Sequence, residues 1–388
     1  MRVLITGVDG YLGWPLALYL AQRGHEVAGI DSFLRRGLVA EMGSQSAIPI
    51  SWIGDRQLAY RESTGNPLLF FKGDLGDYGF VLNAYRSFRP EAIVYLGEQP
   101  SAPYSMMDVE RAVFTQTNNV MGTLVTLHAM REAVPDCHLV KLGTMGEYGT
   151  PNVDIPEGHF DLEYHGRKDR LLFPRQAGSW YHQSKVHDSH NVEMACRIWG
   201  LRSTDVMQGV VYGTRTDEMG EDPRLKTRFD FDQCFGTVIN RFCAQAVIGL
   251  PITPYGGGGQ TRSFIALRDS LQCLGLAVEN PAGPGEYRVF NQFDTVHSVM
   301  ELAERVKWAM VGVGVDAPIE TIENPRQEAE EHYYNPEHVR LYSLGYQPTS
   351  AIGTTMREIL ADLAPHRDRI EAHKGALAPD IYWDRGRC

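Results

Sequence analysis

Short apolar runs alternate with longer amphipathic stretches through the first half of the chain. Runs rich in valine, isoleucine and leucine predict buried strands, and stretches whose apolar residues recur every three or four positions predict helices. The predicted strands are 2–6, 26–30, 68–72, 92–96, 138–142 and 202–207, and the predicted helices are 11–23, 78–88, 110–133 and 179–199. Because strands and helices alternate, we predict an α/β fold with a doubly wound parallel sheet.

Three glycines follow the first predicted strand at intervals of three residues. Gly7, Gly10 and Gly13 stand between that strand and a predicted helix. A strand that turns through such glycines into a helix is the setting of a dinucleotide site, because the first glycine permits the tight turn. The helix N-terminus that follows attracts the pyrophosphate through its free N–H groups. The sequence therefore predicts a dinucleotide cofactor.

The residue that ends the second predicted strand indicates which dinucleotide is bound. Asp31 can accept both ribose hydroxyls of NAD, and its charge would repel the extra phosphate of NADP. Arg35 and Arg36 follow closely and leave NADP open as an alternative to the NAD that we predict. The expected cofactor contacts lie on the glycine loop and near the strand ends: Gly7, Asp9, Gly10, Tyr11, Leu12, Gly13, Asp31, Ser32, Arg35, Arg36, Asp74, Leu75, Leu96, Gly97, Glu98, Asn119, Leu142, Tyr181, Lys185, Gln208 and Val211.

A tyrosine and a lysine four residues apart supply the candidate chemistry. Tyr181 and Lys185 share one face of the predicted helix 179–199, so the ammonium is expected beneath the phenol. A nearby ammonium stabilises the phenolate and lowers the tyrosine pKa, which makes a base for a sugar or alcohol hydroxyl. Thr144 follows the fifth predicted strand, and its hydroxyl can bind the same reacting oxygen. We therefore predict hydride chemistry at these three residues.

Beyond about residue 212 the alternation stops, which predicts a second, smaller lobe. We expect residues 1–212 to form a Rossmann-type NAD-binding domain, with strand and helix returns from about 233–249 and 287–310. Residues 213–388 should form mainly a substrate-binding lobe. The polar stretch 35–66 is too long for a simple connection and predicts an insertion or flap. Helices in the second lobe are predicted near 233–249, 296–310 and 351–363.

Composition excludes several classes of partner. The 388 residues are 43% hydrophobic and 22% charged, which predicts a soluble globular protein with a substantial core. The formal net charge of −11 argues against a nucleic-acid or anionic-membrane surface. No run approaches the roughly 20 apolar residues of a membrane span. The first strand begins at residue 2, so we expect no leader peptide.

Cysteine and histidine spacing gives no sign of a disulfide framework or a metal site. His182, His187 and His190 do not share one helix face, so we predict no metal. The cysteines contain no C-x-x-C pair and predict reduced thiols in a cytoplasmic protein. They stand at positions 137, 196, 234, 243, 273 and 388.

Longer runs of residues carry a more specific likeness. The runs are 98–106, 118–123, 138–151, 181–191, 208–213, 257–262, 324–326 and 330–335. In them the chain resembles the extended short-chain dehydrogenase/reductase superfamily, and within it most closely the UDP-sulfoquinovose synthases. The resemblance implies a tightly bound, recycled NAD that oxidises C4 of UDP-glucose, an intermediate unsaturated between C5 and C6, addition of sulfite at C6, and return of the hydride. It also implies a homodimer.

The resemblance implies roles for residues beside the redox set. It suggests that His182, Met145 and Glu147 lie near the reacting carbons. Oxidation at C4 acidifies the C5 hydrogen, so elimination across C5 and C6 needs a protein base. Ordinary 4,6-dehydratases carry an Asp-Glu pair directly after their threonine, whereas this chain has Met145 and Gly146. His182 and Glu147 therefore stand as alternative groups for the elimination.

The second lobe is expected to hold the nucleotide. Arg262 and Arg326 can clamp a diphosphate bidentately, and residues 251–255 predict a strand whose backbone meets the uracil. The expected substrate contacts, drawn from both lobes, are Gln99, Thr144, Tyr181, Gln208, Asn240, Arg241, Thr253, Tyr255, Gln260, Arg262 and Arg326.

The chain departs from the family pattern at several positions. Pro100 stands where UDP-sulfoquinovose synthases carry an arginine, and Thr117, Met207 and Ala266 replace a histidine, an asparagine and an aspartate. A pocket that receives sulfite is weakened by the loss of a positive charge. One alternative is a nucleotide-sugar epimerase or dehydratase that uses no sulfite. A second alternative is a dinucleotide-binding sensor without turnover, which the presence of both Tyr181 and Lys185 disfavours.

Overall fold

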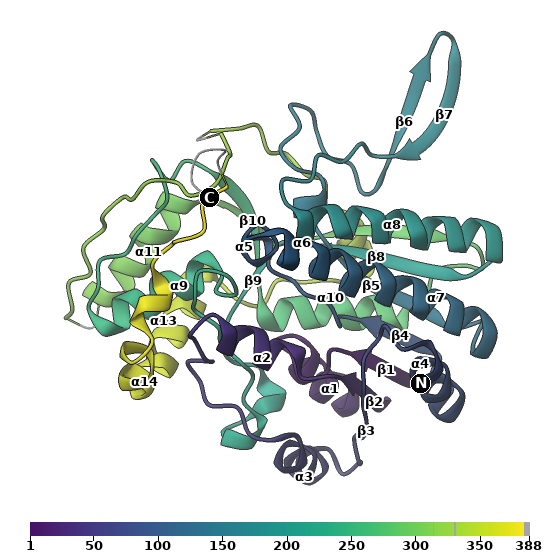
Figure 1. Cartoon of the computed structure of the whole chain (residues 1–388), viewed down its shortest axis with the longest axis horizontal. Helices are drawn as coiled ribbons and strands as arrows, with labels where there is room; N and C mark the ends of the chain where they lie inside the picture. The colour runs from purple at the N-terminus through teal and green to yellow at the C-terminus, as the bar shows by residue number, and fades with distance from the viewer. Residues whose placement is uncertain (313, 330, 384–388) are drawn as a thin grey trace.

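A parallel sheet forms the larger part of the computed structural model, which describes residues 1–312, 314–329 and 331–383. Cys388 and Glu330, named above, lie outside the described residues. Within them, the seven strands of this sheet follow the order β11-β8-β5-β4-β1-β2-β3 (Figure 1). Their bounds are β1 (Arg2–Thr6), β2 (Glu26–Asp31), β3 (Leu69–Lys72), β4 (Ala92–Tyr95), β5 (His138–Thr144), β8 (Arg202–Gln208) and β11 (Tyr287–Gln292). The six strands predicted in the first half of the chain are confirmed. The strand predicted at 251–255 is not present, because only isolated bridges form there, at Ile252 and Tyr255.

Helices cover both faces of the sheet, as the alternation predicts. The larger ones are α1 (Gly13–Gln22) and α10 (Leu267–Glu279) on one face and α4 (Tyr78–Phe88), α7 (Gly122–Ala133) and α8 (Trp180–Trp199) on the other. Successive strand residues point to opposite faces, so Val3 and Ile5 join one core while Leu4 joins the other. Burial on both sides explains why the strands are continuous apolar runs.

A π-helical turn divides the predicted helix 110–133. It is η1 (Thr117–Met121), and it joins α6 (Val109–Gln116) to α7. A π turn holds one more residue than an α turn. Within it the fully buried Asn119 accepts a hydrogen bond from the backbone N–H of Gln99 at 2.9 Å and donates one to Ser184 at 3.0 Å. The turn therefore connects two segments that lead to the site.

The polar stretch 35–66 contains two helices that the sequence pattern does not predict. They are α2 (Leu34–Glu41) and α3 (Ile53–Thr64). The latter packs against α1 and the short turn η4 (Pro223–Leu225). Its buried Ala59 and Tyr60 join the core on the α1 side of the sheet. This insertion therefore lies beside the glycine loop.

The second lobe is built on a helical cluster and a small sheet. Its main helices are α9 (Val238–Ile248), α11 (Val299–Val311), α13 (Ile352–Leu363) and α14 (Arg367–Glu371), and its sheet has the order β12-β10-β9, with bounds Thr295–Ser298, Thr261–Ala266 and Val210–Tyr212. α9 packs against α11, α13 and α14 rather than on the large sheet, so the expected helix return near 233–249 lies in this lobe. β11 returns to the large sheet, and α10 returns with it.

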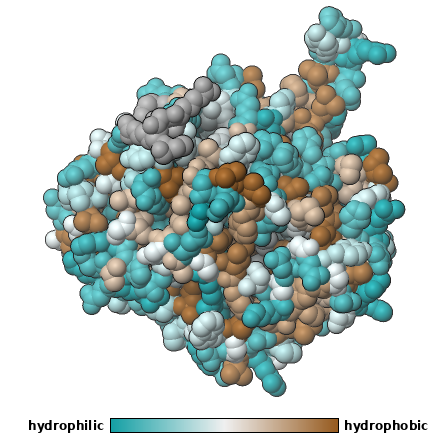
Figure 2. Space-filling view, in the orientation of Figure 1, coloured by the Kyte–Doolittle hydropathy of each residue, from teal (hydrophilic) through white to brown (hydrophobic). Residues whose placement is uncertain are grey.

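A two-stranded hairpin projects from the body of the molecule and was not predicted. It consists of β6 (His159–Tyr164) and β7 (Arg167–Leu172) (Figure 1). Hydrophilic residues cover most of its tip in Figure 2. Both of its stems lead to residues that line the pocket described below, namely Gly149 and Thr150 on one side and Gln176 on the other. In the described ranges, no helix combines the length and the hydropathy needed to cross a membrane.

Candidate active site

A cavity of about 760 Å³ lies between the carboxyl ends of the parallel strands and the second lobe. This edge of a doubly wound sheet is where ligands bind. Glycine-loop residues, strand ends and lobe residues all contribute to its wall. The predicted residues that line it are Gly7, Asp9, Gly10, Tyr11, Leu12, Gly13, Asp31, Ser32, Arg35, Asp74, Leu75, Leu96, Gly97, Glu98, Leu142, Thr144, Met145, Tyr181, His182, Lys185, Gln208, Val211, Asn240, Arg241, Tyr255, Gln260, Arg262 and Arg326.

The glycine loop passes so close to its neighbours that two of its positions exclude any side chain. Gly7 has φ +72°, and a Cβ there would lie 2.9 Å from the carbonyl of Leu96. A Cβ at Gly13 would lie 2.2 Å from the Gly7 carbonyl oxygen. The loop thus leaves the N-terminus of α1 open to the cavity, and that end of a helix favours pyrophosphate. The residues present fit a dinucleotide.

Asp31 lies at the end of β2 on the cavity wall. Its carboxylate accepts hydrogen bonds from the backbone N–H groups of Asp9 at 2.8 Å and Phe33 at 2.6 Å. Burial and the nearby charge of Asp9 raise its pKa, while the two N–H donors lower it. This fixed carboxylate suits the ribose hydroxyls of NAD.

The two arginines that left NADP open are both committed to carboxylates. Arg35 lines the cavity and binds Asp230 at 2.8 Å. Arg36 binds Asp9 at 2.6 Å and does not line the cavity, so its predicted contact with the cofactor is not present. Neither guanidinium is aligned for an extra phosphate. The geometry therefore favours NAD over NADP.

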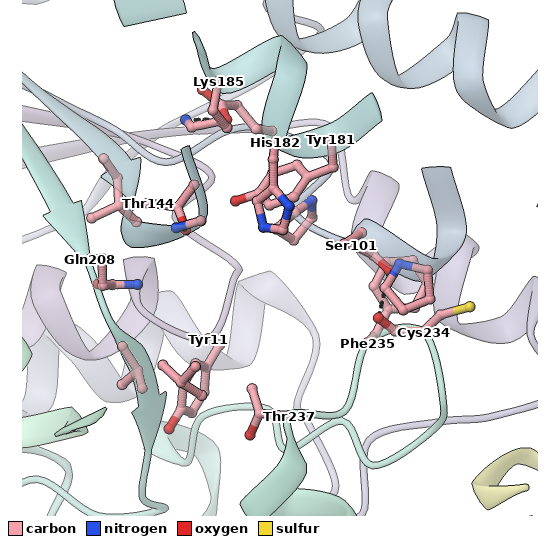
Figure 3. A pocket seen from close by; sticks show the side chains of 18 of the residues that line it. Tyr11, Ser101, Thr144, Tyr181, His182, Lys185, Gln208, Cys234, Phe235 and Thr237 are labelled. Carbon is pink, nitrogen blue, oxygen red and sulfur yellow. Dashed lines mark hydrogen bonds and ion pairs between the residues drawn. The ribbon is translucent and has the colours of Figure 1, made fainter. Parts of the chain in front are cut away.

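Thr144, Tyr181, His182 and Lys185 surround one end of the cavity (Figure 3). Three of them come from the first turns of α8, which Ser179 caps by accepting from the His182 N–H at 3.2 Å. The same Ser179 hydroxyl contacts Nδ1 of His182 at 3.0 Å and so orients the ring. The Nε2 side lies over the turn after β5, where a Cβ on Gly146 would approach Nε2 to 2.3 Å. Only glycine at position 146 leaves room for the imidazole ring of His182 in this position.

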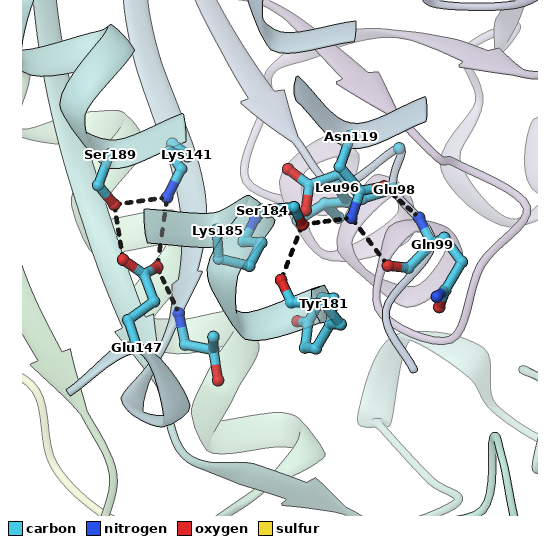
Figure 4. Close-up of polar contacts among 12 residues, drawn as sticks. Leu96, Glu98, Gln99, Asn119, Lys141, Glu147, Tyr181, Ser184, Lys185 and Ser189 are labelled. Carbon is cyan, nitrogen blue, oxygen red and sulfur yellow. Dashed lines mark hydrogen bonds and ion pairs between the residues drawn. The ribbon is translucent and has the colours of Figure 1, made fainter. Parts of the chain in front are cut away.

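Lys185 is paired with a carboxylate rather than with the phenol. Its ammonium forms a buried ion pair with Glu98 at the end of β4 (Figure 4). Burial raises the pKa of Tyr181, and the charge of Glu98 raises it further, whereas Lys141 lowers it. The expectation that the Lys185 ammonium lowers the tyrosine pKa towards neutrality is therefore wrong. Burial is the larger reason, and Glu98, which pairs with Lys185, adds its negative charge.

His182 is neutral over the physiological range. Burial lowers its pKa to about 3, and the positive charges of Arg326 and Arg262 act in the same direction. A neutral imidazole with one ring nitrogen held by Ser179 can accept a proton at the other. His182 is thus equipped as a base on the cavity wall.

Glu147 lies behind the redox set, not in the cavity. It is fully buried, and its carboxylate pairs with Arg175. It also accepts from Ser189 at 2.8 Å and pairs with Lys141 at 3.6 Å (Figure 4). It also accepts from the Thr144 N–H at 3.3 Å. The expected contact of Glu147 with the reacting carbons is therefore not present. A carboxylate that three other side chains hold in place supports the position of Thr144 instead.

Three predicted ligand contacts also lie behind the cavity wall. Gln99 is fully buried and binds Thr115 at 2.8 Å, while Asn119 binds the backbone of Gln99. Thr253 accepts from the Arg241 guanidinium at 2.9 Å through its carbonyl oxygen. Each of these residues supports a neighbour that does line the cavity or lies next to it. None of the three lines the cavity itself.

Three arginines gather at the lobe end of the cavity. Arg241 is 3% exposed and lies over the Tyr255 ring at 4.0 Å. Arg262 contacts Nε2 of His332 at 2.9 Å and pairs with Glu328. Arg326 lies between the rings of Tyr255 and Trp383, at 5.9 Å and 5.5 Å from their centroids. Planar guanidiniums can bind a diphosphate bidentately, which is the chemistry expected of Arg262 and Arg326.

Several residues that line the cavity were missed by sequence reasoning. One sequence signal was available at Gly236, since an isolated glycine indicates a turn, and a Cβ there would lie 2.5 Å from the Phe231 backbone. Trp383 and Tyr334 carry no local pattern because they reach the cavity only through tertiary packing. The missed residues include Pro103, Gln176, Arg228, Gln233, Cys234, Phe235, Gly236, Thr237, Ser263, Tyr334 and Trp383.

In the described part of the chain, no group of three or more His, Cys, Asp or Glu residues could hold a metal ion.

Comparison with known proteins gives consistent results. The sequence profile of the NAD dependent epimerase/dehydratase family matches residues 3–291. The chain is 48% identical to the UDP-sulfoquinovose synthase of Sulfolobus acidocaldarius over 99% of its own length and 98% of that protein. It is 46% identical to the chloroplastic UDP-sulfoquinovose synthase of Spinacia oleracea, over 99% of its own length and 79% of that protein. The crystal structure of the UDP-glucose 4-epimerase of Thermus thermophilus in complex with NAD shares the fold, with a TM-score of 0.66 and 24% sequence identity. The match covers 94% of this chain and 99% of the epimerase chain.

Proposed function

Because this chain belongs to the NAD dependent epimerase/dehydratase family, and within it to the UDP-sulfoquinovose synthases, we propose that it makes UDP-sulfoquinovose from UDP-glucose and sulfite. It is an NAD-dependent enzyme. One observation carries the proposal: a single cavity joins Thr144, Tyr181 and His182 at one end to a cluster of arginines at the other. A sugar nucleotide needs this combination of a redox centre and a diphosphate site.

Oxidation at C4 is the first step that we assign. Tyr181 takes the proton of the 4-hydroxyl in its phenolate form, which the positive charge of bound NAD would favour against the effect of burial, and the Thr144 hydroxyl binds the same oxygen. NAD, when bound, supplies the acceptor for the C4 hydride and later returns it. Lys185 and Glu98 lie beside Tyr181 as a charge pair, so their balance sets how easily the phenol loses its proton.

Elimination of water across C5 and C6 follows. The new C4 ketone acidifies the C5 hydrogen, and neutral His182 removes it. The imidazolium then gives this proton to the departing C6 hydroxyl, which leaves as water. The product of this step has a double bond between C5 and C6, conjugated with the ketone. Glu147 takes no part in the proton transfer because it is enclosed behind the turn.

Addition of sulfite completes the cycle. The sulfur atom bonds to C6, and C5 takes up one proton from solvent. The hydride then returns to C4 and the Tyr181 proton to the oxygen on C4, so the 4-hydroxyl is restored. Hydroxyl at C6 has been replaced by sulfonate, with one water released.

A second candidate function rests on Pro100. This residue lines the cavity at the position where UDP-sulfoquinovose synthases carry an arginine. Without that cation an anionic nucleophile is held less well. A nucleotide-sugar epimerase or dehydratase that uses the same redox set without sulfite is consistent with this difference. A sensor without turnover is not favoured, since Thr144, Tyr181 and Lys185 all line the cavity.

Product analysis decides between these functions. The purified protein is incubated with UDP-glucose, with and without sulfite, and the products are identified by mass spectrometry. UDP-sulfoquinovose that forms only with sulfite supports the proposal. UDP-galactose or a 4-keto-6-deoxy sugar in both samples supports the second candidate. No product from any of a panel of UDP-sugars would contradict both.

We also propose that the enzyme is a cytoplasmic homodimer. α6 packs against α8, and both helices expose apolar side chains that a partner could cover. Val109 and Val113 on α6 are 74% and 58% exposed, and Ile198 on α8 is 61% exposed. The described cysteines are free thiols, which suits a reducing compartment. Light scattering of the purified protein and fractionation of the source cells test the two statements.

A further inference from the structure

Asp9, in the middle of the glycine loop, is held by two arginines of the insertion. Its carboxylate accepts from Arg36 at 2.6 Å and 2.8 Å, and from Arg56 at 2.6 Å. Asp9 is 2% exposed and Arg56 is fully buried. Arg36 belongs to α2 and Arg56 to α3, so both insertion helices are bonded to one loop residue.

Each arginine is itself fixed in place. Arg56 lies 4.0 Å over the ring of Trp14 and donates to the Lys226 carbonyl at 3.1 Å. Arg36 donates to the Ser51 carbonyl at 3.0 Å and lies 5.3 Å from the Trp52 ring. The side chains that hold Asp9 are therefore restricted in their motion, because each guanidinium makes a second contact besides the one with Asp9.

The same loop is also fastened to the second lobe. The Tyr11 hydroxyl donates to the Gly213 carbonyl at 2.7 Å, and the Thr227 hydroxyl donates to the Tyr11 carbonyl at 2.8 Å. On the cavity side, the Asp9 N–H donates to Asp31 at 2.8 Å. Asp9 thus links the insertion to the carboxylate that suits the cofactor ribose.

We propose that Asp9, Arg36 and Arg56 form a retention clamp that keeps NAD in its site from one reaction cycle to the next. Arg36 and Arg56 act as positioning residues, since neither lines the cavity. Release of a bound dinucleotide breaks the contacts between its pyrophosphate and the glycine loop, and the clamp keeps the loop in the position that forms these contacts. The proposal rests on the proposed function in one respect: a hydride that returns to the sugar requires no exchange of cofactor.

A rival explanation attributes any effect of the arginines to their charge alone. Two guanidiniums and one carboxylate leave one net positive charge beside the loop, and this would attract a pyrophosphate without any mechanical restraint. The two explanations differ in what they expect from Asp9→Asn. Loss of the carboxylate makes the cluster more positive, but it releases the loop from both arginines.

The test measures how fast NAD leaves, with no sugar present, so it does not depend on which reaction is catalysed. The full chain is loaded with radiolabelled NAD⁺ and chased with unlabelled NAD⁺. We expect Arg36→Gln to release the label about tenfold faster than the wild type. Arg61→Gln, at an exposed arginine of the same insertion, should release it at the wild-type rate.

Asp9→Asn separates restraint from charge. The clamp predicts faster release, and a rate equal to or slower than that of the wild type would overturn it. So would an unchanged rate in Arg36→Gln. If Asp9→Asn does not fold, Arg36→Lys replaces it, because it keeps the charge and loses the two-pronged bond. In the folded variants the KM for NAD⁺ should rise more than kcat falls, whereas a general loss of structure would lower kcat and raise the KM for UDP-glucose as well.

Discussion

The two ends of the cavity are built in different ways. The cofactor end consists mostly of backbone: glycines 7, 10 and 13 and the ends of parallel strands bring N–H groups close to a ligand. The lobe end consists of long side chains, with Arg241, Arg262 and Arg326 arriving from separate segments. The backbone site needs positions without a side chain, as at the glycines, whereas the lobe end needs the charged side chains of the arginines. Mutations at the two ends should therefore have different signatures.

The largest effect is expected at the redox residues themselves. Tyr181→Phe removes the base for the 4-hydroxyl, and we expect kcat to fall about 10³-fold because a positioned proton acceptor is lost. NAD should still be bound, since the glycine loop is untouched. Single-turnover absorbance of reduced nicotinamide and the NAD content of the purified variant measure the two quantities. Tyr164→Phe, on the exposed hairpin, is the matched control. Normal turnover in Tyr181→Phe would refute the assignment.

A steric change should disable the cofactor end alone. Gly13→Ala places a Cβ 2.2 Å from the Gly7 carbonyl oxygen, and that backbone oxygen cannot yield unless the loop moves. We expect NAD affinity to fall about 100-fold, or about 2.7 kcal/mol. UDP binding, followed by calorimetry, should change little. If UDP binding fell equally, the two ends would not be separable.

The reciprocal change removes a cation from the lobe end. For Arg326→Met we expect the KM for UDP-glucose to rise about 30-fold, because charge-assisted bonds to a diphosphate are among the strong ones. NAD retention should stay at the wild-type level. Arg357→Gln, at an exposed arginine of α13, is the control. A fall in NAD retention in Arg326→Met would contradict the division between the ends.

The same arginine should influence the pH dependence of the elimination. Burial, Arg326 and Arg262 lower the pKa of His182 to about 3, so the imidazole is an available base at neutral pH. Removal of the Arg326 charge favours the imidazolium and raises this pKa. In Arg326→Met the base is therefore lost at a higher pH as the solution is acidified. Mass spectrometry of deuterium exchange at C5, measured as a function of pH, gives the shift. If the pH at which exchange falls on acidification were the same in Arg326→Met as in the wild type, His182 would be excluded as the base.

The smallest effect is expected from an added cation. Pro100 lines the cavity, and Pro100→Arg should lower the KM for sulfite about threefold if the pocket receives that anion. Pro100→Gln has a long side chain without charge and serves as the control. No gain in sulfite-dependent product would favour the second candidate function.

The difference between the two ends also explains what the sequence could predict. Glycine spacing, the aspartate after β2 and the Tyr181–Lys185 pair are local patterns, and the structure brings their residues to one cavity. The π turn, the helices of the insertion and the hairpin have no comparable pattern. Trp383 and Tyr334 reach the cavity through long-range packing, which periodicity does not encode. The lobe contacts were expected mainly because long runs resemble a known family.

Charge partners were the least predictable part of the site. A lysine four residues after a tyrosine indicates a shared helix face, but the sequence does not reveal that Glu98 pairs with that lysine. Glu147 lies three residues after Thr144 and was expected near the sugar, yet Lys141 and Arg175 hold it behind the turn. In both cases the deciding partner comes from a different element. Burial then makes the pairing obligatory, because an unpaired buried charge is costly.

The extra residue in η1 moves one position out of the α-helical hydrogen-bond pattern while the helices on either side continue. A π turn closes with one more residue than an α turn, so deletion of one residue between Thr117 and Met121 would let α6 run into α7 as a plain α-helix. Asn119 would then lose the position from which it bonds Gln99 and Ser184. Exchange of one side chain at an exposed position such as Met121 leaves both bonds in place. The bulge is therefore an inserted residue with a purpose, since it directs one buried amide at two segments that lead to the site.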